Sequence, residues 1–125
     1  MAFDWWDYFT LAQHLQTSTP PGVTEEAARR CAVGRAYFAA FGFAFRYATD
    51  YLGFVPRDNA DDHGRLKAHF RTSRREGVSR RLDRLRGWRN QCDYDSETGD
   101  LVLMLQEAIK DAQFVFDALP PPAIS

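Results

Sequence analysis

The chain has 125 residues, which is enough for one compact domain and too few for two. Its hydrophobic content of 45% is ordinary for a globular core and argues against a disordered chain. The 17 acidic residues nearly balance the 16 basic ones, so the net charge of -1 excludes a uniformly basic or acidic protein, and the distribution of charge becomes the informative property.

Five helical segments are expected, and no alternating strand pattern of useful length occurs. The first covers about residues 4–16, where Asp4 can serve as the N-cap and apolar side chains form one stripe. The paired prolines of TSTPPG end it. The second covers about residues 24–52, begins at the N-cap Thr24 and is apolar on most sides, so we expect it to be the central helix of the fold.

The other three segments cover about residues 59 or 61 to 75, 78–92 and 100–119. A proline-containing break precedes the third, and an acidic turn separates the last two. The sequence therefore predicts an all-α fold, an antiparallel bundle of four to five helices in a single domain over residues 1–119. The proline-rich residues 120–125 are expected to form a flexible tail.

Two glycines and two cysteines carry further expectations. Gly34 and Gly42 lower helix propensity inside the second segment, which a close helix neighbour would explain. Cys31 and Cys92 lack metal-ligand spacing and are expected to be reduced and buried. No secretory signal is seen at the start, and Arg35 interrupts the apolar part of the second segment, so a cytoplasmic protein that does not enter the membrane is expected.

Basic residues are concentrated in one stretch. Ten of the sixteen lie between residues 65 and 89, opposed there only by Glu76 and Asp83. Such density indicates an anionic partner, either nucleic acid or an acidic protein surface. The alternative is a solvated helical surface that forms ion pairs. Within this stretch, the residues expected to bind nucleic acid are Arg81, Arg84 and Arg86.

Arg89 is unusual because it falls on the inward stripe of the fourth segment. The apolar members of that stripe are Val78, Leu82, Leu85 and Cys92. A charge on an apolar face must be paired, and Asp93, four residues on, is the nearest carboxylate in sequence. Two interpretations stay open, a buried structural salt bridge and an arginine held at a subunit interface to bind a phosphate.

Three phrases resemble small prokaryotic proteins of the HEPN superfamily. They are FDWWDYFTLAQHL at residues 3–15, RCAVGRAYFAAF at 30–41, which is similar to an "SRAYYAAF" phrase, and LRGWRNQCDYD at 85–95, which is similar to "LR..RN.ADYD". Their order and spacing carry the resemblance over about residues 3–119. The resemblance implies a helical homodimer.

Many HEPN domains are metal-independent ribonucleases with paired active sites at the two-fold interface. Their motif is an arginine, a polar residue, three variable residues and a histidine. Carried over, it implies a catalytic group of Arg89, Asn90 and Tyr94, with no metal and no cofactor. Tyr94 stands at the histidine position, and tyrosine, with a usual pKa of about 10, is a poorer base at neutral pH than histidine at about 6.5.

The degenerate motif leads to three functional hypotheses. The first is a dimeric module that binds RNA or a protein partner in a toxin–antitoxin or antiviral defence system. Because some HEPN proteins pair with a nucleotidyltransferase-type antitoxin, Tyr94 is also a candidate acceptor of AMP. The second is an active metal-independent endoribonuclease that uses Arg89, Asn90 and Tyr94. The third is a purely structural dimer.

Three histidines could substitute for the one that the motif lacks. His63 and His69 flank the third segment, and His14 ends the first. His69 lies one turn from Arg65 and could face the fourth segment, although surface or capping roles are commoner for a lone histidine. Asp93 and Asp95 are expected to pair with the nearby arginines or to cap the next helix.

Overall fold

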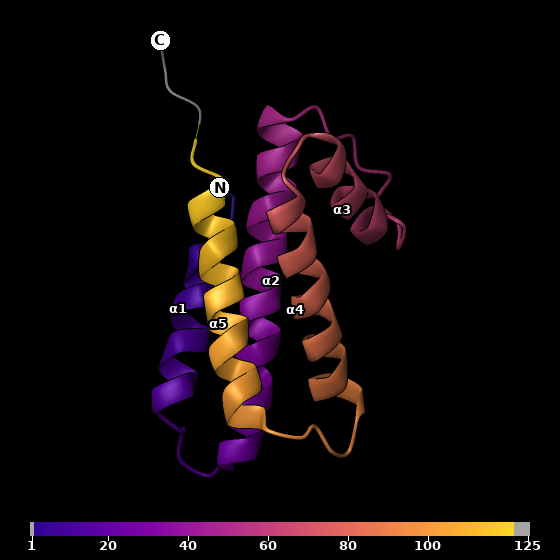
Figure 1. Cartoon of the computed structure of the whole chain (residues 1–125). Coiled ribbons are helices and arrows are strands. Elements are labelled where there is room, and N and C mark those ends of the chain that lie inside the picture. The colour runs from indigo at the N-terminus through magenta and orange to yellow at the C-terminus, as the bar shows by residue number, and fades with distance from the viewer. Residues whose placement is uncertain (1, 122–125) are drawn as a thin grey trace.

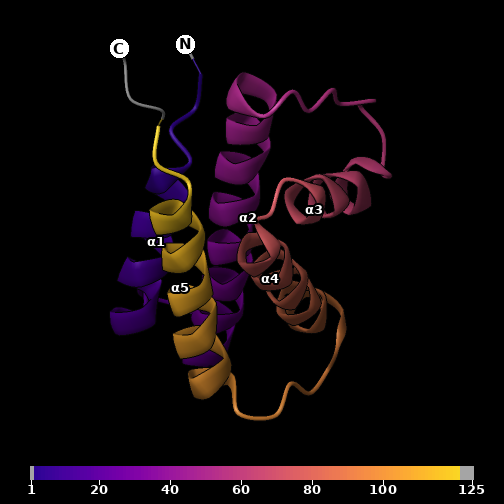
Figure 2. The same cartoon turned by 45° about the horizontal axis from the view of Figure 1, so that its top comes forward.

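The computed structural model describes residues 2–121, and over that range it contains helices and no strand. The helices are α1 (Trp6–Thr17), α2 (Glu25–Tyr51), α3 (Asp62–Thr72), α4 (Glu76–Tyr94) and α5 (Leu101–Ala118). Four of them form the bundle, in which α1 and α4 run in one direction and α2 and α5 in the other, and the short α3 lies against α4 at one end (Figures 1 and 2). The predicted all-α bundle is confirmed, with helix ends displaced by a few residues.

Side-chain caps begin two of the long helices. The hydroxyl of Thr24 accepts a hydrogen bond from the backbone N–H of Ala27 at 3.1 Å, as expected, and the carboxylate of Asp100 accepts one from Leu103 at 3.1 Å. Asp4 stands one residue before the N-cap of α1 and accepts from the N–H of Trp6 at 3.0 Å.

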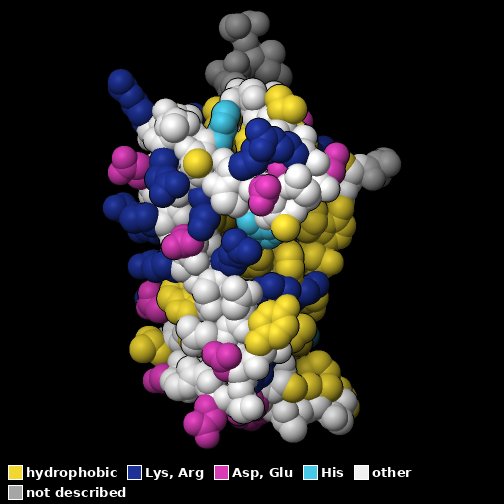
Figure 3. All heavy atoms as spheres, turned by 90° about the vertical axis from the view of Figure 1, so that its right-hand side faces the viewer, with side chains coloured by type: hydrophobic (Ala, Val, Ile, Leu, Met, Phe, Trp, Pro, Cys, Tyr) yellow, Lys and Arg dark blue, Asp and Glu magenta, His cyan; other side chains and the backbone are white. Residues whose placement is uncertain are grey.

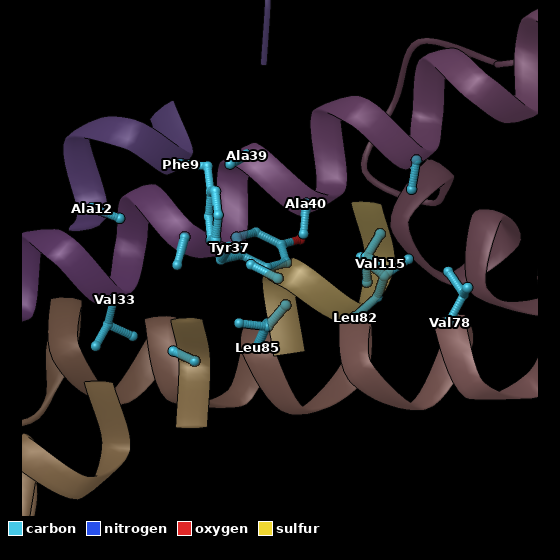
Figure 4. Close-up of a cluster of buried hydrophobic side chains, with 14 of the residues drawn as sticks. Phe9, Ala12, Val33, Tyr37, Ala39, Ala40, Val78, Leu82, Leu85 and Val115 are labelled. Carbon is cyan, nitrogen blue, oxygen red and sulfur yellow. The ribbon is translucent and has the colours of Figure 1, made fainter. Parts of the chain in front are cut away.

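The second helix is the centre of the bundle because small side chains let its neighbours approach closely. Alanines line its buried sides, namely Ala32, Ala36, Ala39, Ala40, Ala44 and Ala48. Tyr37 fills the space between α2 and α4, where its ring lies near Leu82 and Leu85 (Figure 4). Such an interior has little spare volume, so α2 fixes where α1, α4 and α5 lie.

Two expectations about α2 need correction. A Cβ at Gly42 would collide with the ring of Trp5, so the close neighbour is a side chain just before α1, and at Gly34 nothing lies within 4 Å. Cys31 is exposed rather than buried. Cys92 is free and buried, as predicted, with its sulfur 3.6 Å from that of Met104.

The residues after α5 are described only in part. The hydroxyl of Tyr47 donates to the backbone carbonyl of Pro120 at 2.9 Å, which holds the start of the proposed tail against α2. Residues 122–125 of that tail lie outside the described residues. Between residues 2 and 121, no helix combines the length and the apolar character that crossing a membrane requires.

Candidate anion-binding site on α2, α3 and α4

Arg89 lies at the edge of the core, with a quarter of its side chain exposed. Its Nε is 2.8 Å from Asp93 Oδ2 but outside hydrogen-bond geometry, so this contact is an ion pair without a directed hydrogen bond. Its Nη1 donates to Asn90 Oδ1 at 3.1 Å. The i,i+4 pair expected from the sequence is therefore present, and it is half-buried.

Two aromatic rings border the same guanidinium. Its central carbon lies 5.2 Å from the ring centroid of Phe38 on α2 and 5.8 Å from that of Tyr94. Both distances allow cation–π attraction. Tyr94 is 74% exposed at the last residue of α4. The fold thus places Asn90 and Tyr94 beside the guanidinium of Arg89, and Tyr94 is open to solvent.

The three residues expected to bind nucleic acid lie on two sides of α4. Arg81 and Arg84 point toward α5, where both approach the buried carboxylate of Asp111. Arg84 donates through Nε to Asp111 Oδ2 at 2.9 Å, and this bond holds the pKa of Arg84 above its usual value. Arg86 points away from α5 and has no carboxylate at ion-pair distance among residues 2–121. Of the three, Arg86 is the one whose charge is not committed to an internal partner.

The basic stretch divides into two halves according to whether each residue has a carboxylate at ion-pair distance. Arg65, Lys67, Arg81, Arg84 and Arg89 each approach a carboxylate. In the described part of the chain, five have none: Arg71, Arg74, Arg75, Arg80 and Arg86. Dark-blue basic side chains crowd one part of the α3–α4 face and reach its centre, where they border cyan histidine and yellow apolar side chains (Figure 3). The ion-pairing interpretation therefore holds for five of the ten residues, and the anionic partner stays a prediction for the other five.

The histidine nearest to this site is His63, which the sequence did not single out. His69 turns instead toward the end of α2, where its Nε2 lies 2.7 Å from the backbone carbonyl of Leu52. The Nδ1 of His63 lies 2.6 Å from the hydroxyl of Tyr37, and its ring stacks on Phe41 with the centroids 4.2 Å apart. Burial, followed by the nearby guanidinium groups of Arg86 and Arg89, lowers the pKa of His63.

A local signal for His63 exists, but it is incomplete. Tyr37 and Phe41 are four residues apart on α2, so they share a face. Their contact with α3 depends on the loop between α2 and α3, which Asp62 fixes by accepting backbone hydrogen bonds from Arg57 at 3.0 Å and Asp58 at 2.9 Å. These bonds, that of Arg57 foremost, lower the pKa of Asp62. The geometry of such a loop cannot be read from helical periodicity.

Comparison with known proteins adds no relative. No family model, no curated protein and no solved structure matches this chain. Within the described residues, no three side chains of His, Cys, Asp or Glu are grouped so that they could hold a metal ion. The chemistry of the site therefore rests on its own residues. They supply two guanidinium groups, an exposed phenol and an imidazole on the neighbouring helices α3 and α4.

Proposed function

We propose that this protein is a HEPN-like RNA-binding module that acts as a homodimer. It holds the phosphate backbone on the α2–α4 face, which is the surface around Phe38 of α2 and Arg86, Arg89 and Tyr94 of α4. The observation that carries the proposal is the placement of Arg86 and Arg89 one turn apart on α4. Among residues 2–121, Arg86 has no carboxylate partner, and Arg89 lies near the rings of Phe38 and Tyr94. Guanidinium groups bind phosphate oxygens in pairs, and exposed aromatic rings stack on unpaired bases. Single-stranded RNA offers both.

Tyr94 supports binding more than it supports catalysis. Its exposed ring is suited to stacking against a base, and its hydroxyl can donate to a phosphate oxygen. The same exposure would allow a nucleotidyltransferase-type antitoxin to attach AMP there, which would cover Arg89. The wider setting that we propose is a cytoplasmic toxin–antitoxin or antiviral defence system, with another protein of that system as the partner.

The test is a binding titration with a labelled single-stranded RNA at several salt concentrations. Arg86→Ala and Arg89→Ala should each weaken binding by about tenfold and reduce the salt slope by about one. Arg29→Ala is the matched control, since Arg29 lies on the first turns of α2 and pairs with Glu25 at 3.2 Å. Affinity that ignores salt, or that falls equally in the control, would contradict the proposal.

A second candidate function is a metal-independent endoribonuclease. Tyr94 argues against this function because tyrosine is a poorer base at neutral pH than histidine, whereas His63 favours it. An imidazole beside two arginines supplies a proton-transfer group that the motif itself lacks.

A further inference from the structure

We propose that His63, held by Tyr37, is the proton-transfer group of an RNA-cleaving site whose phosphate is bound by Arg86 and Arg89. This inference rests on the proposed RNA binding. It moves the acid–base role from Tyr94, inside the motif, to a residue on α3 that lies 31 positions earlier in the sequence.

The packing of α3 on α4 brings His63 and Arg86 to one place. Lys67 of α3 and Asp83 of α4 form an ion pair at 2.6 Å, which fixes the faces that the two helices present to each other. The two helices form a hairpin, so moving one turn back along α3 corresponds to moving one turn forward along α4. Those moves lead from Lys67 to His63 and from Asp83 to Arg86. Arg89 follows one further turn along α4.

Two contacts from α2 hold the imidazole of His63 in one orientation. Its Nδ1 is engaged by the hydroxyl of Tyr37 at 2.6 Å, and Phe41 lies parallel to the ring at an interplanar angle of 11°. Tyr37 is 2% exposed, so the hydrogen bond is shielded from competing water. The two ring nitrogens point in different directions, so Nε2 remains for a substrate while Nδ1 is held.

The charges around His63 favour its neutral form. Arg86 and Arg89 from α4 and Lys67 from its own helix oppose a positive imidazolium, and only Asp62 supports it. Burial raises the pKa of Tyr37 to about 12, so its phenol stays protonated beside the ring. A neutral imidazole at pH 7 can accept a proton, and a phosphodiester bound to the arginines would then stabilise the imidazolium that forms.

The cleavage step balances with this one imidazole. The step uses the tautomer of His63 that carries its hydrogen on Nδ1, beside the oxygen of Tyr37. In that tautomer Nε2 takes the proton from a ribose 2′-hydroxyl. The 2′-oxygen bonds to the adjacent phosphorus, and the bond from phosphorus to the 5′-oxygen breaks. The imidazolium returns the same proton to the leaving 5′-oxygen, which gives a 2′,3′-cyclic phosphate and a 5′-hydroxyl. Arg86 and Arg89 stabilise the extra negative charge on the phosphorane.

The experiment is cleavage of a single-stranded RNA in the presence of EDTA, with binding measured in parallel on the same RNA carrying 2′-deoxy sugars. His63→Gln should lower the cleavage rate by about a hundredfold or more, with affinity changed by less than about threefold. His14→Gln is the matched control, since His14 is exposed near the end of α1, and it should cleave like the wild type.

A second measurement does not depend on any variant folding. The wild-type rate should rise with pH through an inflection below about 6.5, the usual pKa of histidine, because the base is active only when neutral. Wild-type protein that binds RNA but does not cut it, a His63→Gln variant that cuts normally, or a rate that is flat across that range would overturn the role of His63 and leave the binding proposal standing. Absence of RNA binding would instead overturn the proposed function.

Discussion

At the scale of single residues, Asp93 controls how strongly Arg89 attracts an anion. Its carboxylate lies 2.8 Å from the Arg89 Nε and is 40% exposed, so a phosphate that approaches the guanidinium must compete with it. Asp93→Asn should therefore strengthen RNA binding by about two- to fivefold, the range that a partly exposed ion pair contributes. The comparison is with Asp50→Asn, which changes net charge equally at the Arg46 pair. Equal gains in both variants would show a nonspecific charge effect.

The same residues show what could be read from the sequence. The Arg89–Asp93 pair was predictable because four residues on a helix bring side chains together whatever the rest of the fold does. The pairing of Arg81 and Arg84 with Asp111 was not, because it joins helices far apart in the sequence. The contacts of His63 could not be predicted for the same reason, since its partner Tyr37 lies on another helix.

At the scale of helices, Arg30 of α2 holds the end of α4. Its guanidinium donates to the backbone carbonyls of Cys92 at 3.0 Å, Asp95 at 2.7 Å and Ser96 at 2.9 Å. The last turn of α4 has no basic residue of its own, so this distant cation satisfies carbonyls that would otherwise lack partners. The position of Tyr94, the final residue of α4, depends on it.

Arg30→Ala should consequently lower the free energy of unfolding by about 2 to 3 kcal/mol, since three hydrogen bonds from a charged donor are lost and the part-buried carbonyl of Cys92 is left without its donor. Urea denaturation measures this directly. Arg29→Ala, which removes only a surface pair with Glu25, should cost less than about 1 kcal/mol. If the two variants unfold at the same urea concentration, Arg30 does not hold the helix end.

At Gly42 of α2, helix propensity and packing have opposite effects on stability, whereas at Gly34 only helix propensity counts. Replacing Gly42 by alanine favours the helix by about 1 kcal/mol but pushes a Cβ into the Trp5 ring, which must move. We expect net destabilisation of about 1 to 3 kcal/mol from this overpacking. Gly34→Ala meets no atom within 4 Å and should stabilise the protein. Urea denaturation curves that shift the same way for both would refute the packing role of Trp5.

The helices themselves were predictable, and the reason is local. Their apolar positions recur with the helical period, and Thr24 caps α2 through a hydrogen bond to a residue only three positions away. The exposed Cys31 was predicted wrongly because the apolar run around it indicates burial, whereas its actual exposure depends on where the other helices end. Helices follow from the sequence pattern, but their covered sides follow from tertiary packing.

At the scale of the whole molecule, the proposed dimer can be tested against a defined alternative. Several surfaces carry exposed apolar side chains, and two of them are compared: the first is the α2–α4 face with Tyr94 at 74% exposure, and the second is α1 with Trp6 at 41% and Leu11 at 39%. The RNA-binding proposal needs the first as the interface, because a two-fold axis there would place two Arg86–Arg89 pairs side by side and double the phosphate contacts.

Sedimentation should then give twice the monomer mass of 14.4 kDa for the wild type. Tyr94→Asp should give monomers, because it adds a carboxylate to each of the two copies of the face that meet in the dimer, and Leu11→Asp should remain dimeric. Both positions are exposed in the single chain, so neither change should unfold it. If Leu11→Asp separates the subunits and Tyr94→Asp does not, the dimer forms through α1. The two RNA-binding faces would then point away from the axis, and each chain would have to bind its phosphates alone.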